Sequence, residues 1–202
     1  MDPRAREVIE LWFGKDAIVP PELSKRWFVQ DPAFDAEIGK RFGALIDAAA
    51  RGELDDWGHE PTSALARIIV LDQFPRNVFR NDARAFATDA KALAASRALI
   101  AAGGDRELTF YGRMFAYLPF EHAEDRATQA EAVAHYERLV ADAAAADAPQ
   151  PVRELMGVAL DFARKHAELI EKYGRFPHRN AVLGRPSTPE EQEYLAKPGA
   201  GF

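Results

Sequence analysis

Leu71-Asp-Gln-Phe-Pro-Arg-Asn-Val-Phe-Arg-Asn-Asp-Ala-Arg84 is the stretch around which the rest of the chain is arranged. It follows an apolar run that begins at Ala64 and is hydrophobic nearly all round, as in a buried helix. After this run come side chains that are costly to bury unless they are paired or bound to a ligand: Asp72, Gln73, Arg76, Asn77 and Arg80. The pattern predicts a central helix with a polar cluster at its C-terminal end.

Proline and its neighbours predict where the helices begin. Asp2-Pro3 and Asp31-Pro32 each combine an N-capping side chain with proline in the first turn. Thr188-Pro189-Glu190-Glu191 is the signature of a capping box and predicts a short final helix that ends near Pro198. Asp82 is expected to cap an alanine-rich helix that ends at Gly103-Gly104.

The same residue types predict where helices end. Pro75 is expected to end the central helix, because the residue before proline disfavours the α conformation. Pro119 is expected to close a shorter helix and to leave Phe120-Glu121-His122 beyond it. A helix is expected from about 125 to 146, and a longer one to about Tyr173, with Phe162 and His166 on its inner face.

No stretch shows the period-two alternation of a strand, so the predicted fold is all-α, built from antiparallel helix pairs over residues 1–202 as a single domain. The turns Phe74-Pro-Arg-Asn77 and Phe176-Pro-His-Arg-Asn180 resemble each other. They are consistent with an internal duplication, although Phe-Pro is also common where helices stop. No domain boundary follows from them.

Composition excludes several classes of protein. The formal net charge of −6 argues against a protein held to nucleic acid by neutralising phosphates. The chain has no cysteine, which excludes disulfides, thiolate catalysis and sites with cysteine ligands. Neither a signal peptide nor an apolar run of the ~20 residues needed by a membrane helix is visible, so we expect a cytoplasmic protein that does not bind membranes.

The arginines and amides of the two turns form the first candidate site. Arginine offers a planar fork of donors for carboxylate or phosphate, and helix ends add oriented dipoles. Two such turns facing each other would bind an anion. Alternatively, these residues cap helices and pair with nearby carboxylates, each exposed pair being worth ~0–1 kcal/mol.

The second candidate is the Glu121-His122 pair, which could supply a general base and acid if Pro119 places the two in an irregular turn. On spacing alone, a cap for the following helix is the better interpretation. His166, on an apolar face, is more typical of a core residue; a metal held by His122, His166 and His178 lacks any supporting spacing, so we expect no metal and no cofactor. Neither common nucleotide-binding glycine motif nor a serine-nucleophile elbow is present.

Several of these motifs, in this order, resemble the bacterial family known as domain of unknown function 924. They are Leu11-Trp-Phe-Gly14, Leu71 to Arg80, Ala83 to Asp89, Tyr117 to His122, Gly174 to Asn180 with Leu183-Gly-Arg185, and Pro198 to Phe202. The resemblance implies a tetratricopeptide-like helical superhelix and no established activity. Asn81 stands where the family leads us to expect glycine, which bears on the tightness of that turn.

The family's polar motif positions fall on residues that were largely singled out above on physical grounds: Asp72, Gln73, Arg76, Asn77, Arg80, Arg84, Glu121, His122, His178, Arg179 and Asn180. We add Arg113 and expect Arg76, Arg113 and Arg179 to bind the charge of a small anion or an acidic peptide terminus in a concave pocket. Asp72, Asn77 and Glu121 would hold those arginines. The alternatives are a scaffold that binds a protein partner and a hydrolase or lyase that uses Glu121 with His122 or His178. The oligomeric state is left open.

Overall fold

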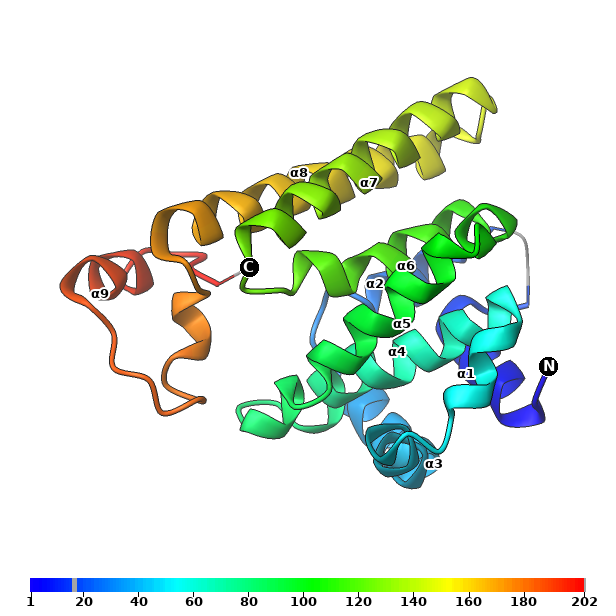
Figure 1. Ribbon diagram of the computed structural model, residues 1–202, viewed down its shortest axis with the longest axis horizontal. Helices are drawn as coiled ribbons and strands as arrows, with labels where there is room; N and C mark the ends of the chain where they lie inside the picture. The colour runs from blue at the N-terminus through cyan, green and yellow to red at the C-terminus, as the bar shows by residue number, and fades with distance from the viewer. Residues whose placement is uncertain (16–17, 202) are drawn as a thin grey trace. The chain divides into compact units, whose positions relative to one another are not determined.

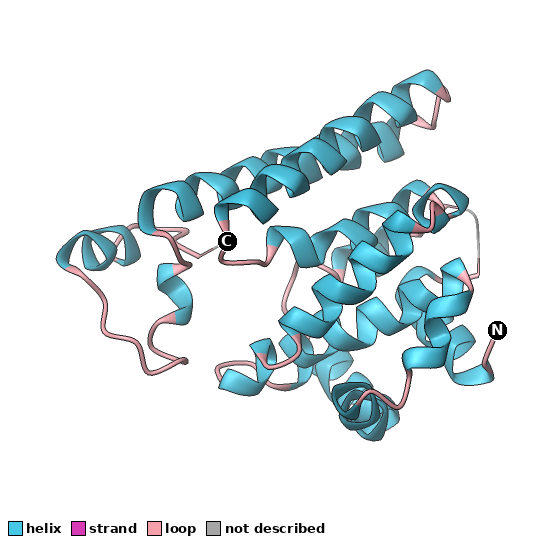
Figure 2. Ribbon diagram, viewed as in Figure 1, coloured by secondary structure: helices cyan, strands magenta, loops and turns pink. Residues whose placement is uncertain are grey.

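The computed structural model describes residues 1–15 and 18–201, and all regular structure in these ranges is helical (Figures 1 and 2). The α-helices are α1 (Pro3–Phe13), α2 (Pro21–Lys25), α3 (Pro32–Arg51), α4 (Pro61–Val78), α5 (Asp89–Ala101), α6 (Phe110–Glu121), α7 (Arg126–Ala145), α8 (Gln150–Tyr173) and α9 (Pro189–Leu195). Within the same ranges, short 3-10 helices lie between them: η1 (Asp55–His59), η2 (Ala83–Phe86), η3 (Gly104–Glu107) and η4 (Pro177–Arg179). The predicted all-α class is confirmed, whereas the superhelical arrangement stays a prediction. Phe202, the last residue of the closing motif, lies outside the described residues.

The chain divides into two compact units. The N-terminal unit consists of Met1–Arg80 and Arg84–Pro119. The C-terminal unit consists of Asn81–Ala83 and of the chain from Phe120 onward. The prediction of one domain over 1–202 stays a prediction, and each unit is described by itself.

In the N-terminal unit, α4 is the central helix and packs against α1, α3 and α5 (Figure 1). Its side chains are buried on nearly all sides from Ser63 to Leu71, which is why its sequence is apolar without a polar face. The ring of Trp12 on α1 contacts those of Phe34, Phe74 and Phe115, with centroids 5.4–6.0 Å apart. This aromatic core joins α1, α3, α4 and α6.

In the C-terminal unit, α7 and α8 lie side by side and antiparallel, and form a hairpin (Figure 2). The buried face of α8 carries Met156, Ala163, His166 and Ile170. Phe162, which we expected to point inward, is 39% exposed. The expected stripe was therefore wrong at this position, although His166 is buried as predicted.

Side-chain caps begin the helices where the sequence predicted them. The carboxylate of Asp31 accepts hydrogen bonds from the amides of Ala33 and Phe34, and Asp2 accepts one from the amide of Arg4. At α9, both halves of the capping box between Thr188 and Glu191 are formed. These caps satisfy amides that have no partner inside the helix.

Pro75 does not end α4, which continues to Val78. A proline inside a helix leaves the carbonyl four residues earlier, here that of Leu71, without its usual amide donor. The hydroxyl of Thr88 donates to this carbonyl oxygen instead, at 2.5 Å. The expected boundary was wrong because a residue thirteen positions after the proline supplies the missing hydrogen bond.

Two further boundaries differ from the prediction. Helix α6 includes Pro119 and ends at Glu121, so Phe120 and Glu121 are helical and only His122 lies beyond the end. Asp82 does not cap α5: the 3-10 turn η2 comes first, and Thr88 occupies the cap position. Asp89 then stands in the first turn of α5, where a carboxylate interacts favourably with the helix dipole.

Within the described residues, no helix combines the length and apolar character needed to cross a bilayer.

Candidate functional site

The first motif builds an ion-pair network in the N-terminal unit. Both terminal nitrogens of Arg76 donate to the carboxylate of Asp89, each at 2.9 Å, and one also donates to the carbonyl oxygen of Asp72 at 2.6 Å. The Asp72 carboxylate lies 3.3 Å from Arg76 and accepts from Gln73 at 2.6 Å. Burial opposes the charge on Arg76, but the carboxylates of Asp72 and Asp89 outweigh it and raise the pKa of the guanidinium. Arg76 thereby links the end of α4 to the start of α5.

Asn77 and Arg80 meet at a different carboxylate. The Asn77 amide donates to Asp35 at 2.7 Å, and Arg80 donates twice to the same carboxylate at 2.6 and 3.1 Å. Asp35 stands in the first turn of α3. The second half of the motif therefore links α4 to the N-terminal end of α3.

Arg113 belongs to a buried network in the same unit. Its Nε donates to the hydroxyl of Tyr117 at 3.3 Å, and that hydroxyl donates to Asp105 at 2.6 Å. Burial and the bond to Asp105 raise the pKa of Tyr117 to about 12, so the hydroxyl stays protonated at neutral pH. All three side chains are at most 6% exposed.

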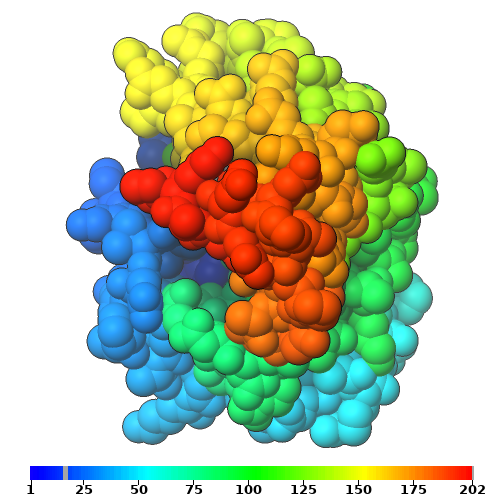
Figure 3. Space-filling view, turned by 90° about the vertical axis from the view of Figure 1, so that its left-hand side faces the viewer, coloured from blue at the N-terminus to red at the C-terminus, as the bar shows by residue number. Residues whose placement is uncertain are grey.

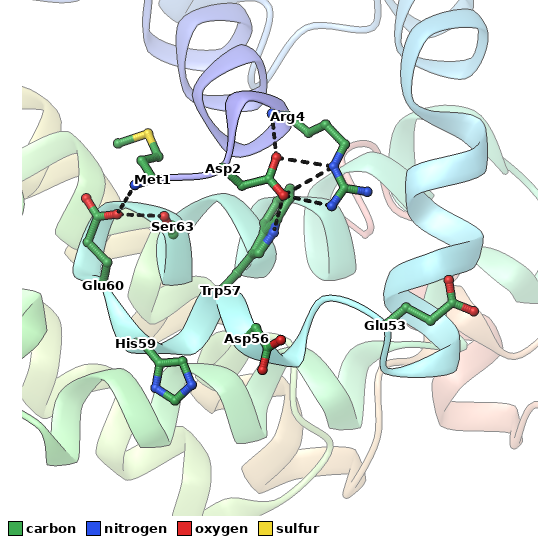
Figure 4. A pocket seen from close by; sticks show the side chains of 9 residues that line it. All are labelled: Met1, Asp2, Arg4, Glu53, Asp56, Trp57, His59, Glu60 and Ser63. Carbon is green, nitrogen blue, oxygen red and sulfur yellow. Dashed lines mark hydrogen bonds and ion pairs between the residues drawn. The ribbon is translucent and has the colours of Figure 1, made fainter.

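A cavity of about 370 Å³ lies at the start of the N-terminal unit (Figure 4). Its lining includes the acidic residues Asp2, Glu53, Asp56 and Glu60, together with Met1, Arg4, Trp57, His59 and Ser63. Arg4 and the indole of Trp57 both donate to Asp2, while Glu60 accepts from Ser63 and lies 3.2 Å from the terminal ammonium (Figure 4). None of the candidate site residues named from the sequence lines this cavity.

In the C-terminal unit, Glu121 and His166 form a buried pair. Nδ1 of His166 lies 2.9 Å from Oε1 of Glu121 and 2.9 Å from the carbonyl oxygen of Phe162. Their side chains are only 4% and 10% exposed. A neutral ring held in this way carries its proton on Nδ1, which leaves the basic lone pair on Nε2.

Two more histidines and an arginine gather beside this pair. The rings of His122 and His166 are 6.2 Å apart, and Phe176 lies 5.4 Å from His166 and 5.6 Å from His178. The guanidinium of Arg179 stands 4.5 Å from the ring of Phe176. We call His122, His166, His178 and Arg179 the histidine cluster.

The electrostatics of the histidine cluster are visible at His178. Burial lowers the pKa of His178 to about 4, and so do the charge of Arg179 and, when they are protonated, His166 and His122, whereas Glu124 acts in the opposite direction. His178 is therefore neutral at neutral pH. Its surroundings disfavour a further positive charge.

Glu124 and Asn180 fix the backbone beneath the cluster. The Glu124 carboxylate accepts two hydrogen bonds from Arg185, at 2.6 and 2.9 Å, and one from the amide of Phe176 at 2.8 Å. The carbonyl oxygen of the Asn180 side chain accepts from Arg185 at 3.0 Å, and its amide donates to Glu191 at 3.2 Å. Glu191 also accepts from Arg175 at 2.6 and 2.7 Å.

Of the residues chosen from the sequence, the structure brings Glu121, His122, His178 and Arg179 into one cluster within the C-terminal unit, and Asp72, Gln73 and Arg76 into one network within the N-terminal unit. Sequence reasoning did not choose Glu124, which lies two residues beyond the motif from Tyr117 to His122, whereas Arg185 is one of the arginines of the second turn. His166 was interpreted as a core residue. Among residues 1–15 and 18–201, no three histidine or acidic side chains are arranged to hold a metal ion.

Comparison with known proteins gives a family but no activity. The model of the family described as "Bacterial protein of unknown function (DUF924)" matches residues 8–199. The solved structure of a protein of unknown function from Agrobacterium tumefaciens, ATU0120, is similar, with 39% sequence identity and a TM-score of 0.79; the match covers 96% of this chain and 97% of that one. No curated protein matches.

Proposed function

The chain belongs to the DUF924 family of bacterial proteins, and we propose that its C-terminal unit binds a small anionic molecule at the histidine cluster. The observation that carries the proposal is the gathering of Arg179, His166 and His178 around the ring of Phe176, with His122 beside His166. Groups that disfavour a positive charge at this place favour a negative one, by the same Coulomb interaction. Arginine and protonated histidine also supply the donors that carboxylate and phosphate groups bind.

Binding of an anion to this cluster is coupled to proton uptake. A negative charge beside His178 offsets the field of Arg179 and raises the pKa of the imidazole. The affinity for the anion therefore increases as the pH falls towards the pKa of His178 in the complex. By linkage, the same anion increases the protonated fraction of His178 at a fixed pH.

The proposal is tested by NMR of the five histidine rings while inorganic phosphate, sulfate or succinate is added. We expect saturable shifts of the His178 and His122 resonances and a raised pKa for His178, with no change at His59 in the N-terminal unit. Arg179→Gln should weaken binding by about tenfold or more, the effect of losing one charge-assisted hydrogen bond. The matched control is Arg153→Gln, because Arg153 pairs with Asp147 at an exposed place in the same unit. Shifts that are absent or unsaturable with all three anions contradict the proposal.

The Glu121–His166 pair favours a second candidate, general base catalysis on an ester that carries a negative charge. Nε2 of His166 would take a proton from water while the water oxygen bonds to the acyl carbon. The proton would pass to the leaving alkoxide as the C–O bond breaks, giving an acid and an alcohol. Glu121 would hold the ring and stabilise its protonated form, as a positioned carboxylate does for histidine bases.

This candidate is tested with the 4-nitrophenyl monoester of succinate. We expect hydrolysis above the buffer rate, lost in His166→Gln and retained in His59→Gln. Equal hydrolysis rates for the wild-type protein and His166→Gln would contradict the proposal that His166 is the general base. They would leave the proposal of anion binding untouched.

A further inference from the structure

The C-terminal tail, residues 196–201, returns to the histidine cluster within the C-terminal unit. After α9 the chain turns at Gly199 and Gly201, both with positive φ. The amide of Gly201 donates to the hydroxyl of Tyr194 at 3.1 Å, and the ring of Tyr194 contacts that of Tyr173 on α8 at 5.6 Å. Figure 3 shows the tail, in red, lying on the surface of the C-terminal unit beside the orange segment that follows α8.

Gly201 lies against His178. A Cβ atom at residue 201 would stand 2.8 Å from Cβ and 3.1 Å from Cγ of His178, which is closer than side chains pack. The φ of Gly201 is +96°, a conformation that residues other than glycine rarely adopt. Only glycine at this position allows the tail to cover the imidazole so closely.

We propose that residues 196–201 form a strap that closes the histidine cluster, and that lifting of Gly201 from His178 admits the anion. The inference rests on the proposed function and adds its regulation. Burial is the largest cause of the lowered pKa of His178, and the strap contributes to that burial. Opening the strap exposes the ring to water and makes its protonation easier.

The charged and titratable groups that act on His178 determine how the strap responds to pH. Arg179, His166 and His122 oppose its protonation, and Glu124 favours it. If His178 were protonated while the strap is closed, its positive charge would lie beside Arg179, His166 and His122 and would be poorly solvated. Acid therefore favours the open strap, and so does an anion that binds the protonated ring.

The experiment compares two alanine substitutions in the tail. Gly201→Ala introduces both the clash with His178 and the strain of a positive φ. Gly199→Ala introduces only the strain, since its φ is +76° and nothing lies within 4 Å of its Cβ position. A chain truncated after Lys197 removes Gly201 altogether. The pKa of His178 is measured by NMR in each protein without added anion, and phosphate is then titrated.

We expect the pKa of His178 to rise from about 4 towards 6.5 in Gly201→Ala and in the truncated chain, and to stay near the wild-type value in Gly199→Ala. Phosphate should bind the first two more tightly at pH 6, by severalfold. An unchanged pKa of His178 in the truncated chain would overturn the proposal of a strap, whatever the result of the phosphate titration. A raised pKa without phosphate binding in any variant would uphold the strap as a cover of His178 and would contradict the proposed anion site.

Discussion

The hydroxyl of Thr88 donates a hydrogen bond of 2.5 Å to the carbonyl oxygen of Leu71, in place of the amide hydrogen that Pro75 lacks. Thr88 is 6% exposed and Leu71 is fully buried. Without this bond a backbone carbonyl would be buried and unsatisfied in the central helix of the N-terminal unit.

Thr88→Val is nearly isosteric but removes the donor. We expect it to lower the free energy of unfolding of the N-terminal unit by about 1–3 kcal/mol, the cost of an unsatisfied buried acceptor. Thr88→Ser keeps the hydroxyl and should lose less. Urea denaturation followed by tryptophan fluorescence measures the effect, because Trp12, Trp27 and Trp57 all belong to this unit. Equal losses for both variants would mean that the γ-methyl group contributes as much as the hydrogen bond, and an unchanged stability of Thr88→Val would contradict the role given to the hydrogen bond.

Arg76→Gln removes the cation between two carboxylates, one of which, Asp72, has a side chain only 1% exposed. Leaving a buried charge without its partner costs about 3 kcal/mol or more, and we expect a loss of that size in the same denaturation experiment. Arg41→Gln is the matched control, since Arg41 forms an exposed pair with Glu37 on one helix. In this control variant the free energy of unfolding should fall by less than about 0.5 kcal/mol. Similar losses for the two variants would contradict a structural role for Arg76.

The Arg175–Glu191 pair predicts sensitivity of the C-terminal unit to acid. The hydrogen bonds from Arg175 lower the pKa of Glu191 from 4.5 to about 2. Since the folded state holds the ionised form more strongly than the unfolded state does, the stabilisation is complete above pH 4.5 and is lost as the pH falls towards 2. Circular dichroism should show Arg175→Gln melting below the wild-type protein at pH 7, with the gap closing between pH 4.5 and 2. A gap that is independent of pH would assign the effect to packing.

Asn81 has a positive φ of 60°, the conformation in which the family resemblance leads us to expect glycine. Asparagine tolerates this region better than alanine does, and glycine adopts it without strain. We therefore expect Asn81→Ala to destabilise the protein by about 1 kcal/mol and Asn81→Gly to be neutral or slightly stabilising. Thermal unfolding of the two variants checks the order, and a less stable glycine variant would show that the Asn81 side chain contributes a contact of its own.

The sequence predicts local features well. The caps at Asp31 and Thr188 act within three residues of the helix start, so their signal is contained in a short window. Pro75 misled the prediction because the donor that allows the helix to continue, Thr88, is brought back by the tertiary fold. A local sequence signal shows which backbone conformation a residue disfavours. It does not show which hydrogen-bond donors the rest of the chain supplies.

The candidate site was harder to predict, since its contacts join distant positions. Glu121 reaches His166 across 45 positions, and Glu124 reaches Arg185 across 61. His166 has apolar neighbours on the buried face of α8, which is the pattern of an ordinary core histidine. The contact with the carboxylate of Glu121 distinguishes His166 from an ordinary core histidine, and only a structure shows this contact.

The α7–α8 hairpin has a consequence for protein engineering. Its turn lies between Ala145 and Gln150, where Asp147 has a positive φ and an almost fully exposed side chain. The 20 residues of α7 separate this turn from Glu121 and Glu124 by about 30 Å, at 1.5 Å of helix rise per residue. An affinity tag, a fluorophore or a fused reporter domain spliced in at Asp147 would therefore sit about 30 Å from the histidine cluster, on the kind of loop that accepts insertions.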